Sequence, residues 1–266
     1  MRRMVLAGIL VMATGFTGLL AQKNKDKGQS QQGGQQQQPQ LVPNTKSVGE
    51  SQSVIALVQS QGNPDKIIAA AEDLTTKYTD SFYKETALLM EAQAYRDKRD
   101  LEKAQIYAER VLEVNPKNFQ ATGMLGEILA QRTRENDLDR EEKFAQATKY
   151  LNDTMENVKT APKPPQATDA QWDDAKKSVT AEAHNNLGLI AMTRKKYDVA
   201  AAEFKTAADL EPEPAYLVRL ASALQNQGKS DEAIAICDKL LADANLHPAI
   251  RNVAQQVKAA AAKTKK

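Results

Sequence analysis

Apolar side chains recur at steps of three and four residues along 181–214, with one interruption near the middle. Leu187 in the first half, and Phe204 and Ala207 in the second half, fall on this spacing. Such steps place side chains on one face of an α-helix. Pro212 ends the second stretch, because proline cannot extend a helix. The pattern therefore predicts two helices that are joined by a turn and packed together.

The same apolar frame returns in three other stretches of the chain. Residues 85–118 and 214–247 fit it well, whereas residues 48–81 fit it more weakly and begin with polar residues that suit an atypical cap. The matching positions are Ala92, Tyr95, Ala104, Ala108, Val111 and Pro116 in the first stretch, Leu217, Leu220, Ala221, Leu224, Ala233 and Leu240 in the second, and Val54, Ile67, Ala71 and Leu74 in the third. An internal period of this kind is typical of helical solenoids.

These positions closely resemble the tetratricopeptide repeat, a helix–turn–helix unit of about 34 residues. Leu187 and Gly188 match its Leu-Gly pair, and Ala200 matches a small position of the second helix. The resemblance covers about residues 48–262 and implies an all-α solenoid that binds peptides or proteins in a concave groove. We expect about five units over residues 48–247 and a capping helix with a basic tail over 248–266.

Two stretches depart from this unit. After residues 119–129 the second helix is delayed to Phe144, and about nine extra, mostly charged residues lie before it, counted against the unit of 34. We expect two lengthened helices with a solvated tip over residues 132–143. Farther along, Thr168 and an apolar stripe that begins at Trp172 indicate that the next first helix starts about ten residues early.

The N-terminus combines Arg2 and Arg3 with an apolar run from Met4 to Leu20, the pattern of a secretory signal peptide over residues 1–21. Cleavage after Ala21 is the preferred interpretation. An uncleaved segment that tethers the protein to a membrane stays open, because the run is near the shortest length that spans a bilayer. Residues 22–47 are rich in Gln and Gly and predict a disordered linker, with a Gln-rich association segment as the alternative.

The composition favours helices, and the charge balance argues against nucleic-acid binding. Aromatic residues make up only 5% of the 266 residues, which favours helices over strands. Without Arg2 and Arg3 the acidic and basic residues number 34 each, so the mature chain is neutral. A neutral chain is poorly suited to nucleic acid, where affinity depends on neutralising phosphates.

The residues that carry chemistry are sparse. His184 and His247 are the only histidines, and no metal-binding spacing joins them. Cys237 stands where Phe204 stands one unit earlier, so we interpret it as a core residue. Acids around Glu141 alternate with arginines, as on a solvated face. Trp172 lies in an apolar stripe and is expected to pack, with an exposed binding hot spot as the alternative. We therefore predict no enzymatic activity, no metal and no small-molecule cofactor.

The resemblance also implies where a partner binds. The groove-lining positions of the family correspond here to Leu89, Gln93, Arg96, Glu127, Asn185, Leu189, Met192, Ser222 and Asn226. They lack the Lys/Asn pattern of members that clamp a terminal carboxylate. The expected function is a non-enzymatic scaffold, periplasmic or secreted, that binds a protein or peptide partner in the bacterial cell envelope. The alternative is an envelope or outer-membrane assembly factor that delivers a partner enzyme or membrane protein.

Overall fold

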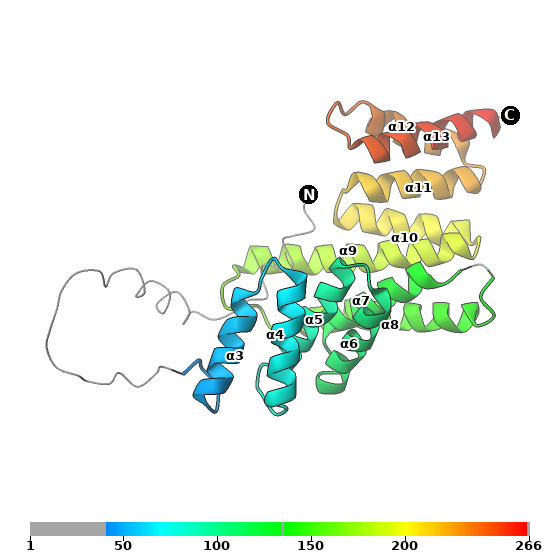
Figure 1. Ribbon diagram of the computed structural model, residues 1–266. Helices are drawn as coiled ribbons and strands as arrows, with labels where there is room; N and C mark the ends of the chain where they lie inside the picture. Colours follow the sequence, from blue (N-terminus) through cyan, green and yellow to red (C-terminus); the bar gives the residue numbers. More distant parts are fainter. Residues whose placement is uncertain (1–40, 135, 265–266) are drawn as a thin grey trace, which may run out of the picture. The chain divides into compact units, whose positions relative to one another are not determined.

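The computed structural model describes residues 41–134 and 136–264, and within them it contains eleven α-helices and no strand (Figure 1). This confirms the all-α prediction. The predicted signal peptide over residues 1–21 and most of the predicted linker lie outside the described residues. No helix of the described part is both long enough and apolar enough to cross a bilayer.

The described part of the chain forms two compact units, of which the first contains residues 41–116 together with 162–169. Its helices are α3 (Val48–Gln59), α4 (Pro64–Lys77), α5 (Lys84–Asp97) and α6 (Leu101–Val114). Ser47, Asn63 and Asp100 each accept a hydrogen bond from a backbone N–H of the first helical turn. Such caps satisfy donors that a helix start leaves without a partner, so the boundaries of these helices are set locally.

The second unit contains the described residues 117–134, 136–161 and 170–264. Its helices are α7 (Phe119–Arg132), α8 (Arg140–Thr160), α9 (Asp169–Thr193), α10 (Tyr197–Leu210), α11 (Pro214–Asn226), α12 (Ser230–Leu241) and α13 (Pro248–Thr264). The first turns of α11 and α13 contain a proline, which suits this position because the first N–H groups have no partner within the helix. The helix α13 is the predicted terminal helix.

Small residues allow the paired helices to approach each other. A Cβ atom on Gly188 would lie 2.6 Å from Phe204 Cε1, and one on Gly126 would lie 2.7 Å from Leu151 Cγ. Real side chains do not approach so closely, so a larger residue would force neighbouring atoms to move. The Leu-Gly positions read from the sequence therefore mark the close helix crossings.

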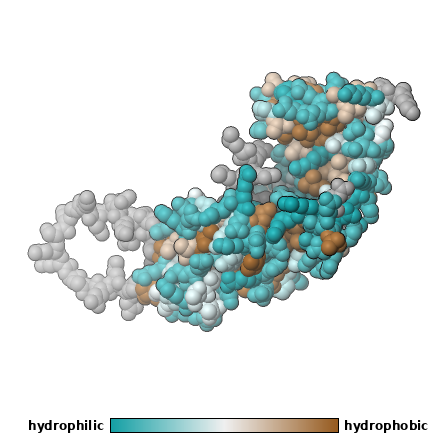
Figure 2. Space-filling model, turned by 45° about the vertical axis from the view of Figure 1, so that its right-hand side comes forward, coloured by the Kyte–Doolittle hydropathy of each residue, from teal (hydrophilic) through white to brown (hydrophobic). Residues whose placement is uncertain are grey.

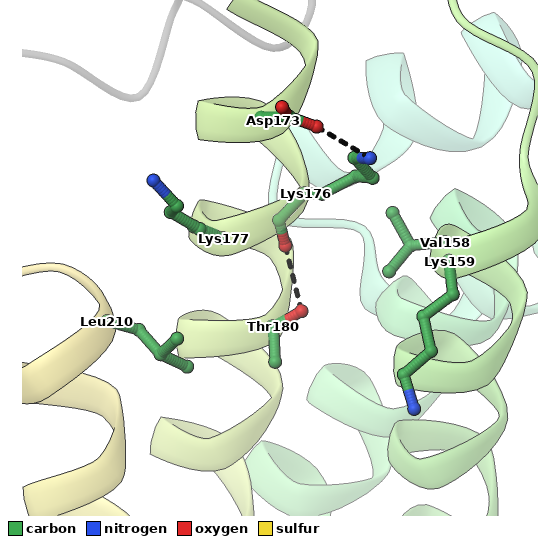
Figure 3. Close-up of a pocket in the computed structure, with 7 residues that line it drawn as sticks. All are labelled: Val158, Lys159, Asp173, Lys176, Lys177, Thr180 and Leu210. Carbon is green, nitrogen blue, oxygen red and sulfur yellow. Dashed lines mark hydrogen bonds and ion pairs between the residues drawn. The ribbon is translucent and has the colours of Figure 1, made fainter. Parts of the chain in front are cut away.

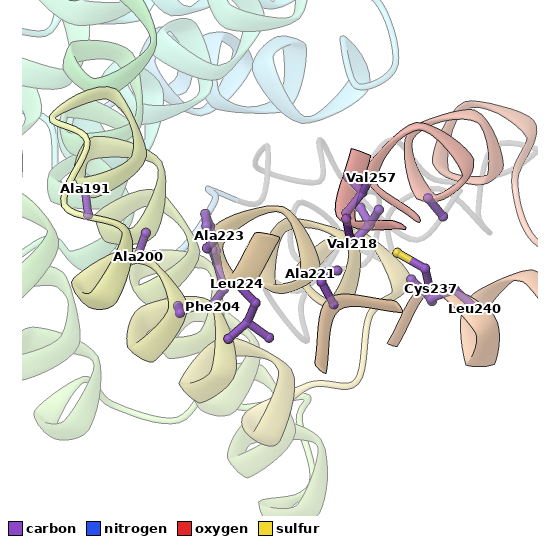
Figure 4. Packing of buried hydrophobic residues seen from close by; sticks show 14 of the residues in the cluster. Ala191, Ala200, Phe204, Val218, Ala221, Ala223, Leu224, Cys237, Leu240 and Val257 are labelled. Carbon is purple, nitrogen blue, oxygen red and sulfur yellow. The ribbon is translucent and has the colours of Figure 1, made fainter. Parts of the chain in front are cut away.

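The largest described core of the second unit joins α9 to α13 (Figure 4). Phe204 and Cys237 are fully buried in it among many alanines. The prediction that Cys237 is a core residue is confirmed, and burial raises the pKa of its thiol. A thiol in these surroundings packs as a small apolar group.

The irregular middle of the array is only partly as expected. The helix α7 has 14 residues and α8 has 21, so only the second helix is lengthened. The prediction of two long helices was wrong because Asn118 caps α7 at its start and the chain leaves the helix at Thr133. The early start of α9 is confirmed, and the Trp172 ring packs with Phe119 at a centroid distance of 6.1 Å.

The last residues assigned to the linker belong to the folded part. Val42 is buried, and its N–H donates to Ser51 Oγ at 3.1 Å. The Tyr83 hydroxyl donates to the Pro43 carbonyl at 2.7 Å. The folded part therefore begins by residue 42, ahead of the boundary drawn from composition, because one buried valine and two hydrogen bonds, one of them to a residue 40 positions away, hold this segment to the first unit.

Candidate binding surface

The nine predicted groove residues are divided between the two units. In the first unit Leu89 is only 2% exposed and belongs to the interior, whereas Gln93 and Arg96 are half-buried on the same helix. A leucine so deeply buried cannot contact a partner without local opening. Leu89 is therefore removed from the candidate surface, and its role is packing.

In the second unit the structure brings together α9 and α11. The predicted residues Asn185, Leu189 and Met192 share one face of α9, because their spacings are four and three residues. Ser222 and Asn226 share a face of α11 with Arg219 for the same reason. We call these six residues the α9–α11 surface. Glu127 lies on α7 and its carboxylate accepts from Gln131 of the same helix.

One contact fixes the polar part of this surface. The Arg219 guanidinium donates from Nη1 to Asn185 Oδ1 across the two helices. Asn185 is 5% exposed, so it anchors the arginine rather than standing out itself. Arg219 is half-buried and has further interactions. A guanidinium held in this way is preorganised, which lowers the entropy lost when it binds a carbonyl or carboxylate oxygen.

The apolar part of the surface comes from Leu189 and Met192. Both side chains are partly buried and pack against the core that joins α9 to α13. The flexible thioether of methionine adapts to partner side chains of different shape. Figure 2 shows hydrophobic patches between hydrophilic side chains on the face that it presents. The α9–α11 surface has this mixed character, which suits recognition of a polypeptide.

Arg219 was not among the groove residues predicted from the sequence. A usable signal was present, because Arg219 follows Asn185 by 34 residues. In a solenoid, residues one repeat apart lie on neighbouring units, so their side chains can meet. Comparing residues at this separation, rather than fixed positions within each unit, would have found the pair.

The other chemically active residues serve packing and ion pairing. His184 Nδ1 lies 2.7 Å from Glu203 Oε2 and links α9 to α10. Lys143 pairs with Asp137 and Asp139, and Arg194 pairs with Glu141 at 2.6 Å. No group of His, Cys, Asp and Glu residues in the described part could hold a metal ion. These contacts account for the acidic cluster as a paired, solvated face.

Comparison with known proteins agrees with this architecture. The sequence matches the tetratricopeptide repeat family over residues 89–155, 166–213 and 185–248. The crystal structure of TTC0263, a thermophilic TPR protein in Thermus thermophilus, matches with a TM-score of 0.54 and 20% identity, covering 78% of this chain and 98% of that chain. The assembly chaperone of RpL4, Acl4 (residues 1–338), matches with a TM-score of 0.39 and 12% identity, covering 80% and 95% of the two chains. No curated protein matches the chain.

The family match covers more than half of the chain. The close crossings at Gly126 and Gly188 stand at the Leu-Gly positions of the repeat. Sequence and structure therefore lead to one conclusion: the chain belongs to the tetratricopeptide repeat family.

Proposed function

We propose that this protein is a non-enzymatic scaffold of the bacterial cell envelope that binds an extended segment of a partner protein on the α9–α11 surface. The observation that carries the proposal is the Asn185–Arg219 hydrogen bond, which fixes a cationic donor at one end of the α9–α11 surface. Leu189 and Met192 follow one and two turns farther along α9 and pack against the core. A fixed donor binds backbone carbonyls or an acidic side chain of the segment. The apolar neighbours bind its hydrophobic side chains.

The envelope part of the proposal is supported by the sequence of residues 1–21. Arg2 and Arg3 precede the apolar run from Met4 to Leu20, as in a secretory signal peptide. The mature chain is neutral and its core is built without a disulfide, since Cys237 is its only cysteine. A core that is complete without a disulfide is compatible with export, because helical repeats build a continuous core.

The experiment compares partners recovered from bacterial envelope extracts by the parent chain and by Met192→Ala/Arg219→Ala. We expect the double variant to recover its main partner about tenfold less well, corresponding to about 1.4 kcal/mol of binding free energy. The control is Lys229→Ala, which removes an exposed cation just beyond α11 and should bind as the parent does. Circular dichroism should show equal helix content in all three chains.

The same experiment can also contradict the proposed binding surface. If the double variant recovers the same partner as well as the parent, the α9–α11 surface is not the binding site. If charge reversal within residues 132–143 then abolishes recovery, the inserted tip is the recognition element instead.

A further inference from the structure

A second candidate surface lies where the second unit departs from the regular repeat. An open cleft of about 400 Å³ lies between the ends of α8 and α10 and the first half of α9 (Figure 3). Its lining residues are Val158, Lys159, Asp173, Lys176, Lys177, Thr180 and Leu210. Four of them belong to the extension of α9 that precedes residue 181, and two belong to the last turns of the lengthened α8. Extra helical turns therefore build this cleft.

The cleft and the α9–α11 surface use different sides of α9. With about 3.6 residues per turn, the side chains of Asp173, Lys176, Lys177 and Thr180 point about 130° away from those of Asn185, Leu189 and Met192. A ligand in the cleft would therefore leave the α9–α11 surface accessible. The two surfaces can be tested independently.

The lining combines an apolar floor with cations on two walls. Val158 is 1% exposed at the floor, and Leu210 closes the side formed by α10. Lys159 stands on α8, and Lys176 and Lys177 stand on α9 (Figure 3). Asp173 is the one carboxylate among the lining residues. An acidic segment that carries an apolar side chain fits this combination.

Each lysine already has an acidic neighbour on its own helix. Lys159 pairs with Glu156 at 2.7 Å, Lys176 with Asp173 at 2.7 Å, and Lys177 with Asp174 at 3.4 Å. The pairs are largely exposed, and exposed pairs contribute about 0–1 kcal/mol each. Carboxylates of a bound acidic segment can replace these partners at little cost in free energy. Neither Glu156 nor Asp174 lines the cleft.

The charge of the chain's own ends argues against self-occupancy. Residues 22–40 contain three lysines and one aspartate, and the last four residues contain Lys263, Lys265 and Lys266. These basic segments do not complement a cleft that is lined by three lysines. We propose that the cleft is a second docking site, and that its ligand is an acidic segment of a partner protein with an apolar side chain among its carboxylates.

The test uses the full chain and an array of short synthetic peptides of random sequence. We expect bound peptides to be enriched in Asp and Glu that flank an apolar residue. The strongest peptide is then labelled and titrated by fluorescence anisotropy. Lys159→Glu/Lys177→Glu should raise its Kd about tenfold or more, and the parent affinity should fall with added salt, because salt screens exposed charges.

Two controls make the outcome decisive. Lys149→Glu/Lys205→Glu reverses two equally exposed lysines on α8 and α10 that lie outside the cleft, and it should leave the Kd within about twofold of the parent, as expected for remote surface charges. Met192→Ala/Arg219→Ala should also leave it unchanged, which separates this site from the α9–α11 surface. Lys159→Gln/Lys177→Gln repeats the test without introducing repulsion.

Three results would overturn the proposal. The array could show no enrichment in acidic residues. A peptide with every carboxylate replaced by an amide could bind as tightly as the acidic one. The control lysine reversals could weaken binding as much as the cleft reversals do, which would mean that the peptides bind to the net charge of the protein rather than to this cleft.

Discussion

At the scale of single residues, Glu91 is the clearest conflict between the repeat pattern and the residue present. It occupies the position that Leu125 and Leu187 occupy in two other repeats. Its side chain is 0% exposed, so the carboxyl group lies out of contact with water. Burial raises the pKa of Glu91 to about 7, and Glu72 adds to the rise, while Tyr107 and Arg110 oppose it. The folded first unit therefore favours the protonated acid.

This burial predicts a loss of stability as the pH rises. The Glu91 pKa is about 7 in the folded chain and near 4.5 without burial, so between these values the folded state binds more protons than the unfolded state. The free energy of unfolding should therefore decrease through this window and stay lower above pH 7. The full effect is on the order of 3 kcal/mol, because one pKa unit corresponds to about 1.4 kcal/mol.

The measurement is thermal or urea unfolding of the parent and Glu91→Gln across this pH range. The glutamine variant should lose most of the pH dependence and be more stable than the parent at pH 8. Glu102→Gln, an exposed neighbour on α6, should keep the profile of the parent. Parallel profiles for the parent and Glu91→Gln would show that this carboxyl does not control the stability of the unit.

At the scale of elements, four of the turns between paired helices share one backbone geometry. Gly62, Arg99, Lys195 and Gly228 have φ values of 83°, 62°, 58° and 82°, and each lies in the turn between the two helices of one repeat. Glycine adopts this left-handed conformation freely, but residues with a Cβ do so at a cost. Of these four turns, the two that contain glycine are therefore relaxed, and the two that contain Arg99 and Lys195 are strained.

This contrast predicts opposite effects for two substitutions. Arg99→Gly should stabilise the first unit by about 0.5–1 kcal/mol, since it removes the left-handed strain, whereas Gly228→Ala should destabilise the second unit by about 1–2 kcal/mol. No heavy atom lies within 4 Å of a Cβ built on Gly228, so the cost would come from the backbone alone. Urea unfolding measures both effects.

Arg99→Ala is the matched control for the gain. It removes the same charged side chain but keeps a Cβ in the left-handed region, so it should not stabilise the unit. Equal gains for the alanine and glycine variants would trace the effect to the arginine side chain and would contradict the strain explanation.

Helices with a regular period were predictable, and local irregularities were not. Phe204, Gly188 and Pro212 define a unit from sequence alone, since spacing and backbone chemistry act locally. The length of α7 was mispredicted because the extra charged residues gave no apolar pattern to mark its end. The folding of residues 42–47 was missed, since it depends on contacts with Ser51 in the following helix and with Tyr83 far along the chain.

At the scale of the whole molecule, three side-chain contacts join residues that are one repeat length apart. Lys46 pairs with Asp80 in the first unit, and Asn185 bonds to Arg219 and Ser230 to Thr264 in the second, all at a separation of 34 residues. Because such contacts join residues of neighbouring repeats, the candidate binding surface could be only partly predicted from positions within one repeat. Spacing within one repeat identified Met192 and Asn185, but Arg219, which bonds to Asn185, belongs to the next repeat.

The N-terminal segment predicts the location of the whole protein. We expect the full chain, expressed in a bacterium, to fractionate with the envelope or periplasm and to begin at Gln22 if it is cleaved. Leu10→Asp/Val11→Asp should hold it in the cytoplasm, because a charge at the centre of an apolar membrane-inserting segment costs about 2.5–3.5 kcal/mol. Cell fractionation and N-terminal sequencing measure both outcomes.

The control places the same charges outside the apolar run. Gln35→Asp/Gln36→Asp lies in the predicted linker, so export should continue as in the parent. A parent chain that is recovered from the cytoplasm with Met1 retained would contradict export, and the scaffold would then have to find its partner there. Because the α9–α11 surface and the cleft lie within the folded units, their binding tests would still apply, so location and recognition are separate properties of this chain.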